Sequence, residues 1–248
     1  MAAAHPAAGP ELHSRATRDG AGLSDGRLHV GADGLAVILR RSARARRLTL
    51  RVPATGGDPV LTIPAGLCEA EALAFAEARV DWLRAALARR PAEIPVGEGT
   101  VFPVEGRLRR LSASGSGAEG AILLPGRKAT LARRAAAWLK TLARDRAAEA
   151  LDHHCSTLGR KASRLTLRDP RGRWGSCSAQ GAIMLSWRLV MAPPEVLDYV
   201  VAHEVAHLAR MDHSPAFWRI VGDLYPGHES PRHWLRTHGA ELHRYRFG

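Results

Sequence analysis

The sequence contains few cysteines and no long apolar run. Its three cysteines, Cys68, Cys155 and Cys177, are scattered, odd in number and without C-x-x-C spacing, which argues against a disulfide framework and fits a reducing cytoplasm. No segment approaches the roughly 20 consecutive apolar residues of a membrane-spanning helix. Residues 1–26 lack the apolar stretch of a secretory signal, and their Ala, Gly, Ser and charged residues predict a disordered leader. We therefore expect a cytoplasmic protein without a membrane segment.

Lysine is also scarce, although the chain is strongly basic. The formal net charge is +12 at pH 7, and it comes almost entirely from arginine. Such a charge favours acidic partners such as nucleic acid, whereas the Ala- and Arg-rich composition could equally reflect a bias across the whole sequence. The densest basic run, from Arg40 to Arg47, could contact a phosphate backbone. Its plainer interpretation is the solvated tip of a hairpin.

The hydrophobic pattern predicts an α+β fold. The chain has 248 residues, of which 46% are hydrophobic, enough for one large domain or two small ones. We predict a smaller strand-rich N-terminal module with one helix over residues 27–128 and a separate domain over residues 129–248. The predicted elements of the module are strands over 35–41, 47–52 and 60–63, a helix over 69–90, and short strands further on. The second domain begins with a long helix over 129–157 that Gly159 ends.

The stretch that carries most chemistry is 199–215. His203 and His207 are four residues apart, so on a helix their side chains project from the same face, a spacing that suits a tetrahedral zinc ion. Glu204 lies between them, rotated by about 100° around the helix axis. From there its carboxylate can reach a metal-bound water without being a ligand. In this H-E-x-x-H arrangement the glutamate is the general base of a metalloprotease.

The residues around this motif favour a metal site over a chance match. The neighbouring valines and alanines predict a helix in the core, where unpaired polar side chains are costly. His213 directly precedes Ser214 and Pro215, which suit the N-cap and the first residue of a following helix. The chain can therefore fold back and offer His213 as a third ligand. His228 and Glu229 are the alternatives for that position.

The sequence resembles the YgjP-like family of predicted metallopeptidases, which is in turn similar to the WLM and SprT-like zinc proteases of the zincin group. The resemblance is strong over about 165–239 and weaker over about 40–83. The segments that carry it are 203–207, 213–218, 173–178, 185–189, 192–195 and 232–235. It implies a zincin-like metallopeptidase domain with zinc on His203, His207 and His213, and with Glu204 catalytic.

A predicted β-hairpin over 173–188 precedes the metal-bearing helix. In zincin-like folds, a strand beside the active helix presents its edge to an extended substrate, and such backbone pairing tolerates many sequences. Trp174, Ser176 and Cys177 are candidates to line that cleft, although Trp174 could equally be a core residue. Arg173 could bind a substrate carboxylate or phosphate, or it could pair with Glu195 or Asp198.

These features together predict a zinc-dependent metallohydrolase. The leading hypothesis is a cytoplasmic metallopeptidase that acts on a peptide or protein and uses a zinc-bound water activated by Glu204. One alternative is zinc-dependent hydrolysis of a nucleotide or another phosphoanhydride, which the arginine excess would suit. Another is a DNA-associated protease or a zinc-binding module without catalysis.

Overall fold

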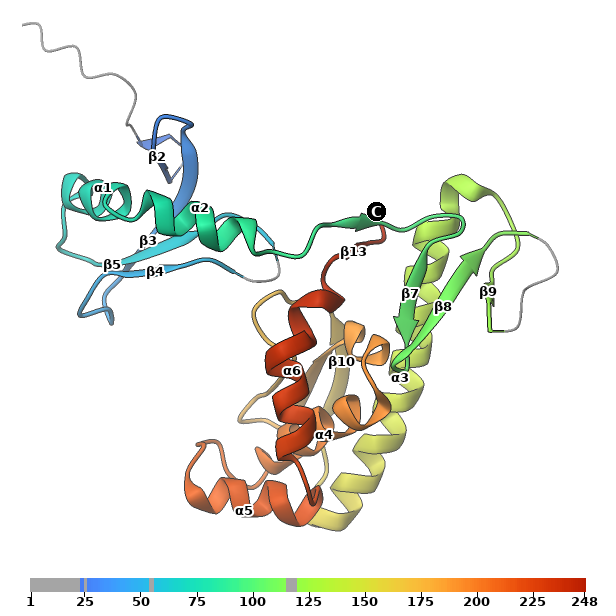
Figure 1. The fold of residues 1–248 in the computed structure, drawn as a ribbon. Helices are drawn as coiled ribbons and strands as arrows, with labels where there is room; N and C mark the ends of the chain where they lie inside the picture. The colour runs from blue at the N-terminus through green and yellow to red at the C-terminus, as the bar shows by residue number, and fades with distance from the viewer. Residues whose placement is uncertain (1–22, 25, 54–55, 115–119) are drawn as a thin grey trace, which may run out of the picture. The chain divides into compact units, whose positions relative to one another are not determined.

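A computed structural model describes residues 23–24, 26–53, 56–114 and 120–248. The chain forms two compact units, shown in Figure 1. The first unit contains the chain up to Val52 and Asp58–Ala86, and the second contains Pro53–Gly57 and Leu87–Gly248. Within the described ranges, no helix combines the length and the apolar character needed to cross a membrane. Residues 1–22 and 25 of the predicted disordered leader lie outside the described residues.

The first unit is a five-stranded sheet with two helices packed on one face. The sheet order is β1-β2-β3-β5-β4. Its elements are β1 (Leu23–Ser24), β2 (Arg27–Val30), β3 (Leu35–Ser42), β4 (Thr49–Arg51), β5 (Val60–Pro64), α1 (Glu69–Glu77) and α2 (Val80–Ala88). Leu61 and Ile63 of β5 are fully buried in a core with Ala72 and Ala76 of α1. The helices therefore cover the face of the sheet that holds these apolar side chains.

Two local expectations for this unit are wrong. Strands β3 and β4 do not form a hairpin, because β5 lies between them, parallel to β3 and antiparallel to β4. The side chains of β5 alternate between buried and half-buried, so the strand has one face in the core. The single predicted helix over 69–90 is divided into α1 and α2. At the break, the backbone N–H of Arg79 donates to the carbonyl of Ala76 at 3.0 Å, a tighter turn than an α-helix makes.

The second unit begins before the predicted domain boundary. Residues 87–128, which we expected in the N-terminal module, belong to it by their contacts. Phe102, Val104 and Leu111 from this segment are buried in the same core as the long helix and the helix with the histidine motif. The strands here are β6 (Ile94–Pro95), β7 (Val101–Val104), β8 (Arg107–Ser112) and β9 (Ile122–Leu123).

The rest of the second unit surrounds two packed helices, α3 (Leu131–Leu158) and α4 (Pro194–Ala206). Gly159 ends α3 in a left-handed conformation with φ 68°, as predicted. A three-stranded sheet of order β10-β12-β11 packs beside α4. Its strands are β10 (Arg164–Arg168), β11 (Gly175–Cys177) and β12 (Ala182–Ser186). The remaining elements are the short 3₁₀ helices η1 (Lys128–Thr130) and η2 (Trp187–Met191), the helices α5 (Pro215–Leu224) and α6 (Glu229–Leu242), and β13 (Tyr245–Arg246).

Trp187 and Arg188, predicted at the end of a strand, are the first residues of η2. The hydroxyl oxygen of Ser186 accepts the backbone N–H of Arg188 at 3.4 Å, which starts the helical turn. The buried Arg188 guanidinium donates to both carboxylate oxygens of Asp169, at 2.7 and 3.0 Å. It also donates to the carbonyls of Leu242 and Tyr245. Arg188 therefore joins the end of α6 to the sheet beside α4.

Candidate metal centre

Helix α4 carries the predicted motif through the core of the second unit. Pro194 is its first residue, where a missing N–H and a fixed φ favour helix initiation. Its buried residues are Val196, Leu197, Tyr199, Val200, Val201, Ala202, Glu204, Val205 and Ala206. His203 lies in the last turn, and His207 is the C-cap with helical φ. Apolar packing on nearly all sides thus fixes the direction in which both histidines project.

His213 reaches the same place from the loop between α4 and α5. The side chain of Ser214 accepts the backbone N–H of Phe217 at 3.4 Å, so Ser214 is the N-cap of α5, as predicted. Phe217 is fully buried, and its ring stacks on His207 with centroids 4.5 Å apart. The same ring meets His213 edge to face at 4.9 Å. Helix α5 therefore holds His213 against the two histidines of α4.

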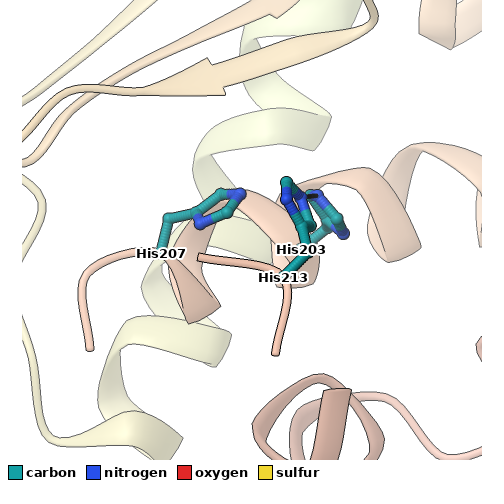
Figure 2. Close-up of side chains that lie close together, drawn as sticks. All are labelled: His203, His207 and His213. Atoms are coloured by element: carbon teal, nitrogen blue, oxygen red, sulfur yellow. Dashed lines mark hydrogen bonds between the residues drawn. The ribbon is translucent and has the colours of Figure 1, made fainter. Parts of the chain in front are cut away.

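The three histidines are close enough to share one metal ion. One candidate ligand atom from each lies within 4.8 Å of the others, and Figure 2 shows the His207 ring turned toward the other two. The Nε2 atoms of His203 and His213 are 3.3 Å apart. Two ligands of a tetrahedral zinc ion, each about 2.0–2.1 Å from the metal, are separated by about 3.3–3.4 Å. This pair therefore has the spacing that a tetrahedral ion requires.

The protonation of the histidines suits metal binding. Burial and the neighbouring histidines lower the pKa of His203 to about 3, and burial lowers that of His207, so both rings are neutral at physiological pH. Nδ1 of His207 lies 2.9 Å from the carbonyl of Arg210. A carbonyl can only accept, so Nδ1 carries the hydrogen and the lone pair of Nε2 remains for a ligand. The donor set fits a borderline-soft cation such as zinc.

Glu204 is buried against strand β11. Its side chain is only 5% exposed, and this burial raises its pKa to about 7, against the opposing effect of the positive charge on Arg173. A Cβ atom at Gly175 would lie 2.4 Å from Oε1 of Glu204, so the carboxyl group occupies the space that a side chain at 175 would fill. The sequence motifs do not single out Gly175. A glycine inside a strand is nevertheless a recognised sign of close approach by another group.

The structure places the four predicted substrate-binding residues on or just before β11. Arg173 is exposed and acts electrostatically on Glu204. Asp198, one of its suggested ion-pair partners, instead pairs with His154 at 2.7 Å. The Trp174 ring packs on α6, where a Cβ at Gly239 would lie 3.0 Å from it, and it faces His243. Trp174 therefore has a core role, and its role in substrate binding stays a prediction.

Ser176 and Cys177 lie on the outer strand of the sheet and are half-buried. Burial, and then the charge of Glu204, raise the pKa of the Cys177 thiol, which disfavours the nucleophilic thiolate. The carbonyl of Trp174 accepts from Ser186, and Ser178 donates to Ala182. Because bonded pairs alternate in an antiparallel ladder, the backbone N–H and C=O groups of Gly175 and Cys177 point away from β12. This edge is available for a further strand.

Comparisons with known proteins show which family the sequence matches. The sequence model of a family described as YgjP-like, metallopeptidase domain, matches residues 46–238. Among solved structures, that of the metallopeptidase zymogen abylysin from Pyrococcus abyssi matches with 25% sequence identity and a TM-score of 0.33, covering 37% of this chain and 94% of that chain. No curated protein matches the chain. The family match includes α4, β11 and all three histidines.

Proposed function

The chain belongs to the YgjP-like metallopeptidase family, and from this premise we propose that it is a zinc-dependent peptidase in which Glu204 is the general base. As a family member it is a hydrolase. The observation that carries the proposal is the convergence of His203, His207 and His213 beside a buried carboxyl group. We also propose a zincin-like arrangement for the domain. The described cysteines are free, which supports the cytoplasm as the compartment of the protein.

The three histidines would hold the metal through neutral ring nitrogens. When bound, zinc supplies a water of lowered pKa and polarises the carbonyl of the scissile bond. The chain contributes fixed imidazole rings, because Phe217 and the carbonyl of Arg210 restrain their orientation. No other described group of three or more His, Cys, Asp or Glu side chains has a comparable arrangement. We therefore assign the metal to this place.

Glu204 would move the proton. Its carboxylate accepts a proton from the attacking water and later delivers it to the nitrogen of the leaving amine. A pKa raised to about 7 matches this double role, because both the charged and the neutral forms are then accessible near neutral pH. The contact with the backbone at Gly175 restricts where the carboxyl group can lie. Its position beside β11 supports a reaction at that edge of the sheet.

The outward backbone groups of Gly175 and Cys177 would bind the substrate as an added strand. Main-chain hydrogen bonds hold an extended peptide with little dependence on its sequence. Arg173 lies just before the strand, where its charge would suit a carboxylate of the substrate. This mode favours an unfolded or extended segment of a protein over a compact one.

Cleavage of a labelled unfolded protein by the zinc-loaded chain tests this proposal. We expect Glu204→Gln to lower the rate by about 10²–10⁴-fold, the usual contribution of a general base, with zinc still bound. Glu149→Gln, which neutralises an exposed carboxylate on α3, is the matched control and should retain activity. Absence of cleavage by the loaded wild type, with release of phosphate or pyrophosphate from nucleotides, would instead support a phosphoanhydride hydrolase.

A further inference from the structure

The sheet of the first unit has one face that its helices do not cover. Side chains alternate between the two faces of a strand, and α1 and α2 pack against the face that holds Leu28, Val37, Leu61 and Ile63. Among the described residues of this unit, no element packs on the opposite face. We call it the open face, and its residues are Arg27, His29, Ala36, Ile38, Arg40, Ser42, Thr49, Arg51, Val60, Thr62 and Pro64.

The strand register arranges the open face in rows. One row crosses four strands from Arg27 through Ile38 and Val60 to Arg51. Neighbouring strands are about 4.8 Å apart, so the backbones of Arg27 and Arg51 are about 14 Å apart. The next row contains Arg40, Thr62 and Thr49. Arginines therefore lie on more than one side of a narrow strip of β-branched side chains, formed by Ile38, Val60 and Thr62.

The connection between β3 and β4 adds three more arginines at one end of this sheet. Arg44, Arg46 and Arg47 are all exposed. Within the part of the chain that the structure describes, no carboxylate forms an ion pair with any of these three, nor with Arg40 or Arg51. Arg27 pairs with Asp58 at 3.3 Å, but both side chains are more than 40% exposed, and such pairs contribute little. The positive charge of this surface is thus almost uncompensated.

A general excess of arginine does not explain this concentration. Elsewhere in the chain several arginines are neutralised locally: Arg84 pairs with Asp33 and Asp81, and Arg146 pairs with Glu105. On the open face and its adjoining loop the carboxylates are missing, apart from Asp58. Five of the eight residues from Arg40 to Arg47 are arginine, whereas the whole chain has 36 basic residues among 248, so the local density of positive charge is far above the average of the chain.

We propose that the open face and the adjoining Arg44, Arg46 and Arg47 bind the phosphate backbone of a nucleic acid. The guanidinium fork matches phosphate geometry, and threonine hydroxyls such as those of Thr49 and Thr62 commonly donate to phosphate oxygens. The described residues of the open face include no Phe, Tyr or Trp for stacking on bases and no Asn or Gln for reading their edges. Binding is therefore carried by contacts of the arginines with the phosphate backbone rather than by stacking on bases.

Salt-dependent binding of labelled single-stranded and duplex oligonucleotides tests this proposal. The Glu204→Gln chain is used, so the result does not depend on peptidase activity. We expect binding at about 50 mM salt that weakens by at least tenfold towards 200 mM. The double variant Arg40→Gln/Arg51→Gln should lower the slope of log affinity against log salt by about 0.9 per lost contact for duplex, or about 0.7 for single strands.

The matched control is Arg133→Gln/Arg144→Gln, which removes the same charge from exposed positions on α3. It should retain the wild-type slope. All four side chains are exposed, so we expect both double variants to fold normally. Thermal unfolding checks this. Equal losses in the two variants would assign binding to net charge alone and overturn the proposal. Absence of binding at low salt would also overturn the proposal. Equally tight binding of a polyglutamate peptide would overturn it too, because it would show that the face binds acidic proteins.

Discussion

The position of Glu204 depends on the absence of a side chain at residue 175. The carboxyl group lies where a Cβ would be, 2.4 Å from Oε1, a distance that two such atoms cannot maintain. The backbone of β11 cannot retreat easily, because Gly175 is in register with the buried Leu185 of β12. Any side chain at residue 175 must therefore displace Glu204.

Gly175→Ala should strongly reduce peptidase activity while zinc stays bound. A displacement of about 1 Å in a catalytic group can lower the rate by about 10²-fold, and the three atoms nearest to the added Cβ all belong to Glu204 and none to a histidine. Measurements of kcat/KM and of zinc content would show that activity is lost while the metal is retained. Gly172→Ala is the matched control, since a Cβ there meets nothing within 4 Å. Full activity in Gly175→Ala would contradict the position assigned to Glu204.

His243 should make the fold sensitive to acid. Burial, followed by the positive charge of Arg188, lowers the pKa of His243 to about 4. Between pH 6.5 and 4, His243 is protonated in the unfolded chain but stays neutral in the folded chain. The free energy of unfolding therefore decreases as the pH falls through this window. The shifted pKa of His243 makes the free energy of unfolding about 3 kcal/mol higher above pH 6.5 than below pH 4.

Chemical denaturation of His243→Gln at several pH values tests this contribution. The variant should lose the part of the pH dependence that His243 supplies, so its stability should fall less than that of the wild type between pH 6.5 and 4. His238→Gln changes an exposed histidine of α6 and serves as the control. Parallel curves for the wild type and His243→Gln would show that His243 does not carry this effect.

At the scale of elements, the start of α5 determines where His213 lies. Ser214→Ala removes the side-chain oxygen that accepts the N–H of Phe217 and should cost about 1 kcal/mol of stability. Because residue 214 follows His213 directly, the affinity for zinc should fall as well. Ser214→Asp keeps a capping oxygen and should restore both. Unfolding and competitive zinc titrations measure the two effects, and unchanged zinc affinity in Ser214→Ala would argue against this role.

The elements that could be predicted from the sequence are those defined by local patterns. Helical periodicity with clear ends located α3, α4 and α5, and the spacing of His203, Glu204 and His207 indicated the candidate metal centre. The insertion of β5 between β3 and β4 could not be predicted in this way, because pairing between distant strands leaves no local signal. Gly175 was missed for a similar reason: its meaning depends on Glu204, which lies 29 positions away on another element.

At the scale of the whole molecule, the candidate metal centre and the arginine-rich open face belong to different compact units. The second unit holds the candidate metal centre, and the first carries the exposed arginines of the open face. The domain boundary was predicted too late in the chain because 87–128 consists of short strands that resemble those before them. Burial of Phe102 and Leu111 with α3 and α4 assigns them to the second unit, and only the contacts reveal this.

The zinc content of the purified chain tests the central claim most directly. Elemental analysis should find near-stoichiometric zinc in the wild type and in His233→Ala, which changes an exposed histidine of α6. It should find little in His203→Ala or His213→Ala, because three ligands are needed to hold a catalytic zinc ion. Zinc retained in His213→Ala would move the third ligand elsewhere, with His228 and Glu229 as the next candidates. No metal in the wild type, even after reconstitution, would contradict the account.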